Sequence, residues 1–542
     1  MNNAIFDFPA PRNEAVLEYL PGSAERKALS DELAAQAGAQ IEIPLVIGGQ
    51  EVRTGKLGKV VMPHEHGHVL ATYHMATERE VAMAIEAARR ARDGWMALSW
   101  IERSAITLKA AELISRKHRA RLNAATMLGQ GKNAYQAEID AACETVDFLR
   151  YNVHFASEIY HQQPRSAADQ LNRVEYRPLE GFVLTVTPFN FTAIGSNLNM
   201  SVVLMGNTTL WKPASTALLS NYTLVKIFEE AGLPPGVVNF LPGSGPLIGA
   251  AALSHPDLAG IHFTGSNASF NSLWHMVSER LESYRGYPKL VGETGGKDFI
   301  FAHASADPQE LSVALLRGAF EYQGQKCSAC SRAYLPRSLW PAVRERLVDM
   351  LAQVRVGGPE DFDNFVNAVI DERSFDNIMG YIARAKASPD VEVVAGGTGD
   401  KSRGYFVQPT VLLTRDPGYV TMREEIFGPV LTVFVYEDKD YLDTLRLCDQ
   451  TSPYALTGAI FSRDRAAAVQ ACQVLRYAAG NFYYNDKCTG AMVGMQPFGG
   501  ARASGTNDKA GGPLNLLRWT SPRTVKETFL PATDFRYPYM SR

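Results

Sequence analysis

Cysteine is scarce in this chain. Its 542 residues include six cysteines, too few for a disulfide framework, so we expect a reducing compartment. No apolar stretch approaches the roughly 20 residues that span a bilayer, and the first 29 residues resemble neither a secretory signal nor a typical transit peptide. We therefore expect a cytoplasmic protein, or one of the mitochondrial matrix if the source is eukaryotic and a presequence has been removed.

An excess of either charge is also absent. The formal net charge is −3, and 46% of the residues are hydrophobic, which is ordinary globular composition. This balance gives no electrostatic basis for binding nucleic acid or an anionic membrane, so neither is an expected partner. The length predicts about two to four domains.

A metal site is not expected. His64, His66 and His68 lie close together after Pro63, but no further His or Cys follows at ligand spacing. We interpret this stretch as a solvated loop.

Strands and helices alternate through most of the chain, after two predicted helices at 78–98 and 102–150. This alternation indicates βαβ units and parallel sheets. In the first half, strands are predicted at 182–186, 208–212, 237–240 and 260–263, with helices at 196–205 and 218–230. In the second half, strands are predicted at 299–301, 332–335, 431–436 and 457–461, with helices at 311–320, 340–354 and 375–387. Segments 172–176 and 521–528 have alternating patterns and predict edge strands outside the two main sheets.

Two glycine-containing turns are candidates for binding a dinucleotide. Residues 243–249 nearly match the dinucleotide fingerprint, but the last glycine comes one residue late. Residues 263–266, FTGS, are better placed, because Gly265 follows a predicted strand and an amphipathic helix comes next. The N-terminus of such a helix suits a pyrophosphate. The alternative is a helix capped by Ser266 with no ligand.

A thiol and a carboxylate are the candidate catalytic pair. Cys327 lies in the sequence GQKCSACS, and Glu293 lies 34 residues upstream in GETGGK. A thiol among small and polar residues indicates covalent catalysis with a general base, and it needs exposure and a lowered pKa to act as a nucleophile. For a lone cysteine, an ordinary buried thiol is the better interpretation.

Further motifs favour a catalytic role for Cys327 over that of an ordinary buried thiol. In chain order they read PFNF at 188–191, KPA at 212–214, FTGS at 263–266, EEIFGP at 424–429 and PFGG at 497–500. From about Pro21 to the C-terminus, the chain resembles the aldehyde dehydrogenase superfamily. The resemblance implies an α/β fold with a Rossmann-type NAD-binding domain, an α/β catalytic domain and a small β oligomerisation flap. The expected divisions are 1–160 and 181–292 for NAD binding, 293–490 for catalysis, and 161–180 and 505–542 for the flap. It also implies a homodimer or higher homo-oligomer.

The resemblance assigns roles in catalysis. Cys327 would attack an aldehyde carbon, while the Asn190 amide and the Cys327 backbone N–H would hold the oxyanion. Glu293 would activate the water that hydrolyses the resulting thioester.

NAD is the cofactor that the resemblance implies. Its contacts would be main chain around Thr187, Lys212 and Ser215 at the adenosine ribose, Gly265 and Ser266 at the phosphates, Glu425 at the nicotinamide ribose and Phe427 at the ring. Many members have an acid where Ser215 stands. A carboxylate repels a 2′-phosphate and serine does not, so discrimination against NADP is expected to be weaker here.

The substrate follows from residues 489–509 and 324–332, which are similar to the branch of the family that oxidises L-glutamate γ-semialdehyde. This aldehyde forms from Δ1-pyrroline-5-carboxylate, and its oxidation to L-glutamate is the second step of proline catabolism. By this resemblance, Gly490, Ala491 and Ser328 would hold the substrate carboxylate, and Phe191 and Phe498 would sandwich its methylene chain.

Three alternatives stay open at this point: another acidic semialdehyde such as succinic semialdehyde, a cysteine hydrolase without redox chemistry, and a non-catalytic protein on this fold. No barrel typical of proline dehydrogenase is predicted, so we expect a monofunctional enzyme. A separate proline dehydrogenase is a candidate supplier of its substrate.

Overall fold

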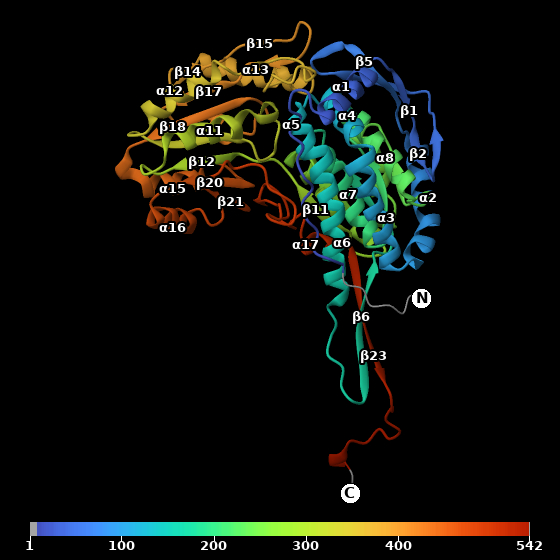
Figure 1. Ribbon diagram of the computed structural model, residues 1–542. Helices are drawn as coiled ribbons and strands as arrows, with labels where there is room; N and C mark the ends of the chain where they lie inside the picture. Colours follow the sequence, from blue (N-terminus) through green and yellow to red (C-terminus); the bar gives the residue numbers. More distant parts are fainter. Residues whose placement is uncertain (1–7, 541–542) are drawn as a thin grey trace.

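The computed structural model describes residues 8–540 and contains two seven-stranded sheets side by side (Figure 1). In the first sheet, neighbouring strands β11, β10, β7, β8 and β9 are parallel, and β2 and β3 are antiparallel additions at one edge. In sheet order, the strands are β11 Lys289–Glu293, β10 Leu258–Thr264, β7 Phe182–Val186, β8 Thr208–Lys212, β9 Val238–Phe240, β2 Leu45–Ile47 and β3 Gln50–Val52. Their apolar runs are covered on both faces, as parallel strands require.

The second sheet is parallel except for its edge strand β14. In sheet order, the strands are β14 Val391–Ala395, β17 Thr410–Thr414, β18 Val430–Tyr436, β13 Cys330–Pro336, β12 Asp298–Ala302, β20 Thr457–Phe461 and β21 Asn481–Tyr484. The prediction of an α/β fold with parallel sheets is confirmed.

Helices cover both sheets (Figure 1). Around the first sheet they are α1 Ala24–Ala37, α2 Glu78–Ala97, α3 Trp100–Glu112, α4 Arg119–Gln130, α5 Ala134–Ala137, α6 Thr145–His161, α7 Thr192–Leu204, α8 Leu218–Ala231, α9 Gly245–Leu253 and α10 Asn267–Ser278. Later in the chain come α11 Pro308–Phe320, α12 Trp340–Leu351, α13 Glu372–Lys386, α14 Val420–Arg423, α15 Tyr441–Gln450, α16 Arg465–Val474 and α17 Pro513–Arg518. No helix within residues 8–540 is long and apolar enough to cross a membrane.

The single helix predicted at 102–150 is wrong. The segment turns at Gly131, which has φ +70° and ends α4, and Asn133 then caps α5. A Cβ on Gly131 would lie 2.8 Å from the Ala368 carbonyl oxygen, so this turn packs directly against the second half of the chain. π-Helical turns at Leu113–Lys117 and Glu138–Glu144 interrupt the segment further.

The histidine-rich stretch is not the solvated loop that we predicted. It opens β5 (Glu65–His74), the central strand between β1 (Ile41–Ile43) and β4 (Leu57–Met62). His64 is buried, and its Nε2 lies 2.9 Å from Glu360 Oε1. The stretch is polar enough for a loop, but contacts with the distant segment around Glu360 bury His64.

The two predicted flanking strands pair with each other. β6 (Gln170–Pro178) and β23 (Thr520–Thr528) form an antiparallel ribbon that extends from the body of the molecule (Figure 1). Within residues 8–540, neither strand pairs with a third, so each keeps an open edge.

Candidate active site

One edge of the first sheet gathers several of the predicted site residues. The parallel strands β7, β8, β10 and β11 end at Val186, Lys212, Thr264 and Glu293, and adjacent strands end in register. Ligands of open α/β sheets bind beyond the carboxyl ends of the strands. Thr187, Gly265 and Ser266 follow these ends directly.

The second sheet contributes the candidate nucleophile from the amino ends of its strands. Cys327 lies just before β13, and Glu425 and Phe427 lie just before β18. Gly296 connects them, because its N–H donates to Glu425 Oε1 at 2.9 Å. A Cβ on Gly296 would lie 2.2 Å from the Cys327 carbonyl oxygen, so only glycine fits this close approach.

Asn190 lies beside the nucleophile segment. Its buried side chain donates from Nδ2 to the carbonyl oxygen of Gln325 at 3.0 Å, two residues before Cys327. An amide nitrogen carries two hydrogens, so one remains for an oxyanion. The loop that presents Asn190 is fixed in turn by Gln130, whose Nε2 donates to the Phe189 carbonyl at 2.6 Å.

Glu293 has the properties of a general base held in a dry environment. A Cβ on Gly499 would lie 3.1 Å from Glu293 Oε1, which shows how closely the backbone packs on the carboxyl group. The pKa of Glu293 is raised to about 8, mainly by burial; Lys509 opposes the rise and Asp508 adds to it. Among the described residues, Glu293 Oε2 has no hydrogen-bond partner, which leaves it free to bind water.

The nucleophile does not have the lowered pKa that we expected from the sequence. Cys327 is half-buried, and burial raises the pKa of its thiol well above the usual range. The carboxyl groups of Asp298, Glu293 and Glu425 raise it further. The thiol is therefore neutral in the free enzyme at neutral pH, and attack requires that its proton leave to a base.

Several of the residues predicted to contact a dinucleotide lie at this edge of the first sheet. Lys212 Nζ lies beside Gly245 at the start of α9, where a Cβ would be 3.9 Å away, and burial lowers the pKa of Lys212. Ser266 caps α10 by accepting from Ser269 N, and Gly265 N donates to the Glu293 carbonyl at 3.1 Å. The start of α10 therefore lies next to Glu293, the candidate general base.

Three other cofactor candidates complete this region. Thr187 Oγ1 accepts from Trp211 Nε1 at 2.9 Å, and Ser215 begins a short turn after Lys212. Phe427 has φ +60° and packs edge-on against Phe189, with ring centroids 5.7 Å apart. This strained backbone fixes the direction of the Phe427 ring.

The structure brings Ser328 to the predicted carboxylate loop. Ser328 Oγ lies 2.7 Å from Thr489 Oγ1, and Cys488 Sγ donates to the Ser328 carbonyl at 3.5 Å. Gly490 follows with φ +96°, a conformation that favours glycine, and Ala491 comes next. The hydroxyl and the loop amides are therefore adjacent.

The two phenylalanines are held by separate supports. The buried Lys132 ammonium lies 4.1 Å from the centre of the Phe191 ring. Phe498 exchanges backbone hydrogen bonds with Ala510 at 2.9 and 2.8 Å.

Sequence reasoning missed supporting residues around the site. Lys509 Nζ donates to the carbonyls of Gly480 and Gly499 at 2.9 Å each, which fixes the backbone against Glu293. Lys297 is buried, and burial lowers its pKa to about 7. Lys297 belongs to the GETGGK motif, so the motif could have identified it as a site residue. No local sequence pattern indicates that Lys509 faces Glu293.

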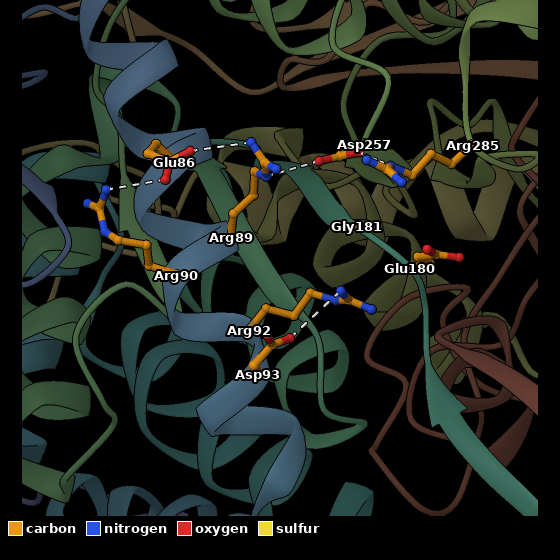
Figure 2. A pocket seen from close by; sticks show the side chains of 9 residues that line it. All are labelled: Glu86, Arg89, Arg90, Arg92, Asp93, Glu180, Gly181, Asp257 and Arg285. Atoms are coloured by element: carbon orange, nitrogen blue, oxygen red, sulfur yellow. Dashed lines mark hydrogen bonds and ion pairs between the residues drawn. The ribbon is translucent and has the colours of Figure 1, made fainter.

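A polar cavity of about 340 Å³ lies away from these residues, near the amino ends of β7 and β10. Four arginines and four carboxylates line it, and Figure 2 shows Arg89 between Glu86 and Asp257. Because its charges balance and pair with one another, we interpret it as a structural ion-pair cluster.

The sequence profile of the aldehyde dehydrogenase family matches residues 51–525. The chain belongs to the aldehyde dehydrogenase family.

Individual relatives are similar over nearly the whole chain. Delta-1-pyrroline-5-carboxylate dehydrogenase, mitochondrial, of Dictyostelium discoideum is 54% identical over 98% of this chain and 96% of its own. The crystal structure of Delta-pyrroline-5-carboxylate dehydrogenase from Mycobacterium tuberculosis bound with NAD is 52% identical, with a TM-score of 0.97 over 100% of both chains. Proline utilization A from Bdellovibrio bacteriovorus is 30% identical, with a TM-score of 0.91, over 97% of this chain and 54% of that chain.

Proposed function

We propose that this enzyme oxidises L-glutamate γ-semialdehyde, formed from Δ1-pyrroline-5-carboxylate, to L-glutamate with NAD. The observation that carries the proposal is the convergence of Cys327, Asn190 and Glu293 between the two sheets, with Ser328 tied to the loop of Gly490. The names of the M. tuberculosis and D. discoideum relatives support this substrate, and the NAD in the former structure supports the cofactor.

Residues at and just beyond the carboxyl ends of the first sheet would hold NAD. The start of α10 would face the pyrophosphate, Lys212 the adenosine ribose and Glu425 the nicotinamide ribose. When bound, the oxidised cofactor supplies the hydride acceptor and a positively charged ring.

The protein residues then divide the chemistry. The Cys327 thiol loses its proton to solvent water, and the resulting thiolate adds to the aldehyde carbon. The second N–H of Asn190 and the Cys327 backbone N–H stabilise the oxyanion that forms. After oxidation to the thioester, Glu293 takes a proton from water, which attacks the acyl carbon. Breaking the carbon–sulfur bond releases glutamate and restores Cys327.

The direct test is NADH formation from Δ1-pyrroline-5-carboxylate, compared with succinic semialdehyde and with NADP. We expect kcat/KM to be highest for the first substrate with NAD. A preference for succinic semialdehyde would contradict the proposed substrate, and thioester hydrolysis without any need for NAD would favour a cysteine hydrolase.

The carboxylate loop offers a test of substrate choice. Gly490→Val places a β-branched residue at φ +96°, so the loop has to rearrange and its amides leave the substrate carboxylate. We expect KM for glutamate semialdehyde to rise at least about tenfold, the equivalent of about 1.4 kcal/mol, while propanal oxidation is spared. Steady-state kinetics with both aldehydes measure this difference.

Phe191→Ala is the comparison variant for Gly490→Val. Stacking on a methylene chain does not depend on a carboxylate, so the loss of Phe191 should weaken the binding of both aldehydes. If Gly490→Val impairs the oxidation of propanal as much as that of glutamate semialdehyde, the loop is structural and the substrate assignment loses its main physical support.

We further propose the domain division 1–160 with 181–292, 293–490, and 161–180 with 505–542. The open edges of the ribbon formed by β6 and β23 support a homodimer or higher homo-oligomer that assembles through it. The likeness to a proline utilization protein supports coupling to a separate proline dehydrogenase. The mitochondrial relative supports the matrix if the source is eukaryotic.

Truncation before Ser521 tests the assembly, because it removes nearly all of β23 and leaves β6 unpaired. We expect insoluble protein or monomers by size-exclusion chromatography with light scattering. A matched truncation after Leu530 keeps the ribbon and should keep the native assembly. If the first truncation stays soluble and keeps the same oligomeric state as the full chain, a role of the ribbon in assembly is refuted.

A further inference from the structure

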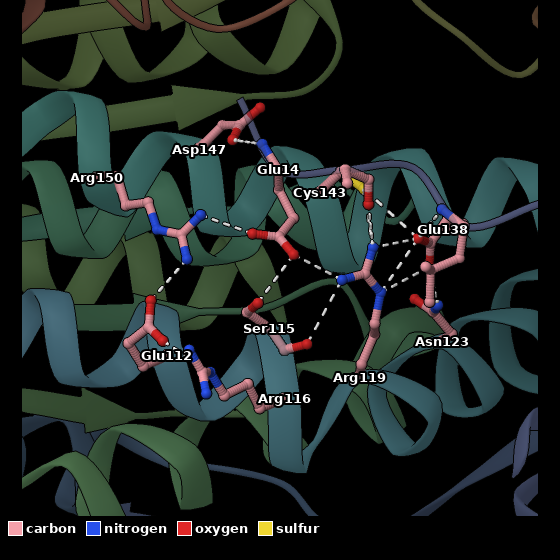
Figure 3. A network of polar contacts seen from close by, with 12 residues as sticks. Glu14, Glu112, Ser115, Arg116, Arg119, Asn123, Glu138, Cys143, Asp147 and Arg150 are labelled. Atoms are coloured by element: carbon pink, nitrogen blue, oxygen red, sulfur yellow. Dashed lines mark hydrogen bonds and ion pairs between the residues drawn. The ribbon is translucent and has the colours of Figure 1, made fainter. Parts of the chain in front are cut away.

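The segment that precedes α1 lies along a buried polar network (Figure 3). Glu14 accepts from Arg119 at 2.7 Å and from Arg150 at 2.6 Å, and Leu17 N donates to Glu138 at 2.8 Å. Tyr19 donates to the same Glu138 carboxylate at 2.6 Å. These charge-assisted bonds fix residues 13–19, which we name the N-terminal arm, to helices α4 and α6 and the turn between them.

Asn13 leads this arm and contacts a different part of the protein. Its Nδ2 donates to Asp147 Oδ2 at 2.7 Å and to the Val493 carbonyl at 2.9 Å. Its Oδ1 accepts from the Tyr151 hydroxyl at 3.1 Å. The side chain amide therefore bridges α6 and a residue 480 positions away in sequence.

Val493 belongs to the loop that presents Gly490 and Ala491. At its start, this loop is held by the contact between Thr489 and Ser328. At its far end, Val493 is buried against Phe148 and bonded to Asn13. The two amides lie between these anchors, so the position of the second anchor sets the direction in which they point.

The packing beside Asn13 restricts the conformation of the loop. Gly494 has φ +80°, and a Cβ there would lie 2.1 Å from the Tyr151 ring. The same tyrosine donates its hydroxyl to Asn13, so the ring and the amide hold consecutive residues of the loop. Loss of the amide leaves the Val493 carbonyl without this donor.

We propose that Asn13 is a positioning residue for substrate recognition, which aligns the amides of Gly490 and Ala491 with the carboxylate of the substrate. This inference rests on the proposed function, because it needs a substrate with a carboxylate at that loop. Asn13 touches neither the aldehyde carbon nor Cys327, so it acts on binding and not on the chemical steps. The N-terminal arm thereby becomes part of the specificity of a site whose other residues lie far along the chain.

The test compares Asn13→Ala with the wild-type enzyme on glutamate semialdehyde and propanal. We expect KM for glutamate semialdehyde to rise about three- to tenfold with kcat nearly unchanged, since one or two hydrogen bonds are lost. The kinetic constants for propanal should stay within about twofold. The dissociation constant of L-glutamate, measured by calorimetry on the Cys327→Ser protein with and without Asn13→Ala, should rise by a factor similar to that of KM.

Two further variants separate positioning from folding. Tyr151→Phe keeps the ring against Gly494 and removes only the bond to Asn13, so we expect a smaller change in the same direction. Arg12→Ala alters an exposed neighbour and should match the wild type. Thermal unfolding of each variant reports whether the arm has been released.

The possible failures are distinguishable. If the wild-type enzyme does not prefer glutamate semialdehyde, the proposed function fails. If it does, and both Asn13→Ala and Tyr151→Phe keep its KM, the positioning role is refuted. Equal losses for propanal and glutamate semialdehyde would also refute it, because they would indicate general damage to the fold.

Discussion

Replacing Cys327 with serine should reduce aldehyde oxidation by at least about a thousandfold while NAD binding persists. The site already raises the pKa of the thiol through burial and three nearby carboxyl groups. A hydroxyl starts with a far higher pKa and is a much poorer nucleophile at this position. Steady-state NADH formation measures the loss, and quenching of tryptophan fluorescence by NAD measures the retained binding.

Cys330→Ser is the matched control. Cys330 is buried at the start of β13, where its Sγ contacts the Arg332 carbonyl at 3.6 Å, and we assign it no part in the chemistry. This variant should keep most of the activity. If it is the inactive one, the assignment of the nucleophile is wrong.

Replacing Glu293 with glutamine should separate the two halves of the reaction. Glutamine has nearly the same shape but cannot accept a proton from water. One equivalent of NADH should therefore form in a burst, while turnover falls about a hundredfold or more. Stopped-flow absorbance at enzyme concentrations comparable to the substrate measures both phases.

The pH dependence adds a second measurement. Burial holds the pKa of Glu293 at about 8, so the carboxyl group is mostly protonated below that pH and acts as a base above it. Hydrolysis of the thioester should accelerate as pH rises through about 8 in the wild type and lose this rise in Glu293→Gln. Equal loss of burst and steady rate would instead show that Glu293 acts before the thioester forms, as the acceptor of the Cys327 proton.

The sequence predicted the strands of the core best. Segments 182–186, 208–212 and 457–461 match β7, β8 and β20 at both ends, because short apolar runs between turn residues have few other solutions. The break at Gly131 was missed, since a single glycine in an alanine-rich stretch does not reveal that the Ala368 carbonyl will lie against it. The burial of His64 was missed for the same reason: its partner, Glu360, is about 300 residues away.

The candidate site also has features that the sequence predicts and features that it does not. Cys327, Glu293 and Asn190 were predicted as site residues because their motifs resemble a family. The structure brings the elements that carry them close together, and their roles stay a prediction. The raised pKa of Cys327 was not predictable, because it depends on burial and on carboxyl groups from three other segments. Lys509 and Asn13 were missed because each donates to backbone carbonyls, which any sequence supplies, and because the other partners of Asn13 lie more than 130 residues away.

The ribbon of β6 and β23 has a consequence for how the protein is made. Arg523 Nε donates to Glu175 at 2.8 Å across the ribbon, although 348 residues separate them in sequence. At the usual pace of translation, about 5–20 residues per second, β6 leaves the ribosome roughly 20 to 70 seconds before β23 is synthesised. During that interval β6 has both edges unpaired, and a neighbouring nascent chain offers the same strand. Correct pairing of β6 therefore has to wait until β23 has been synthesised, and slow synthesis of the last half should increase aggregation.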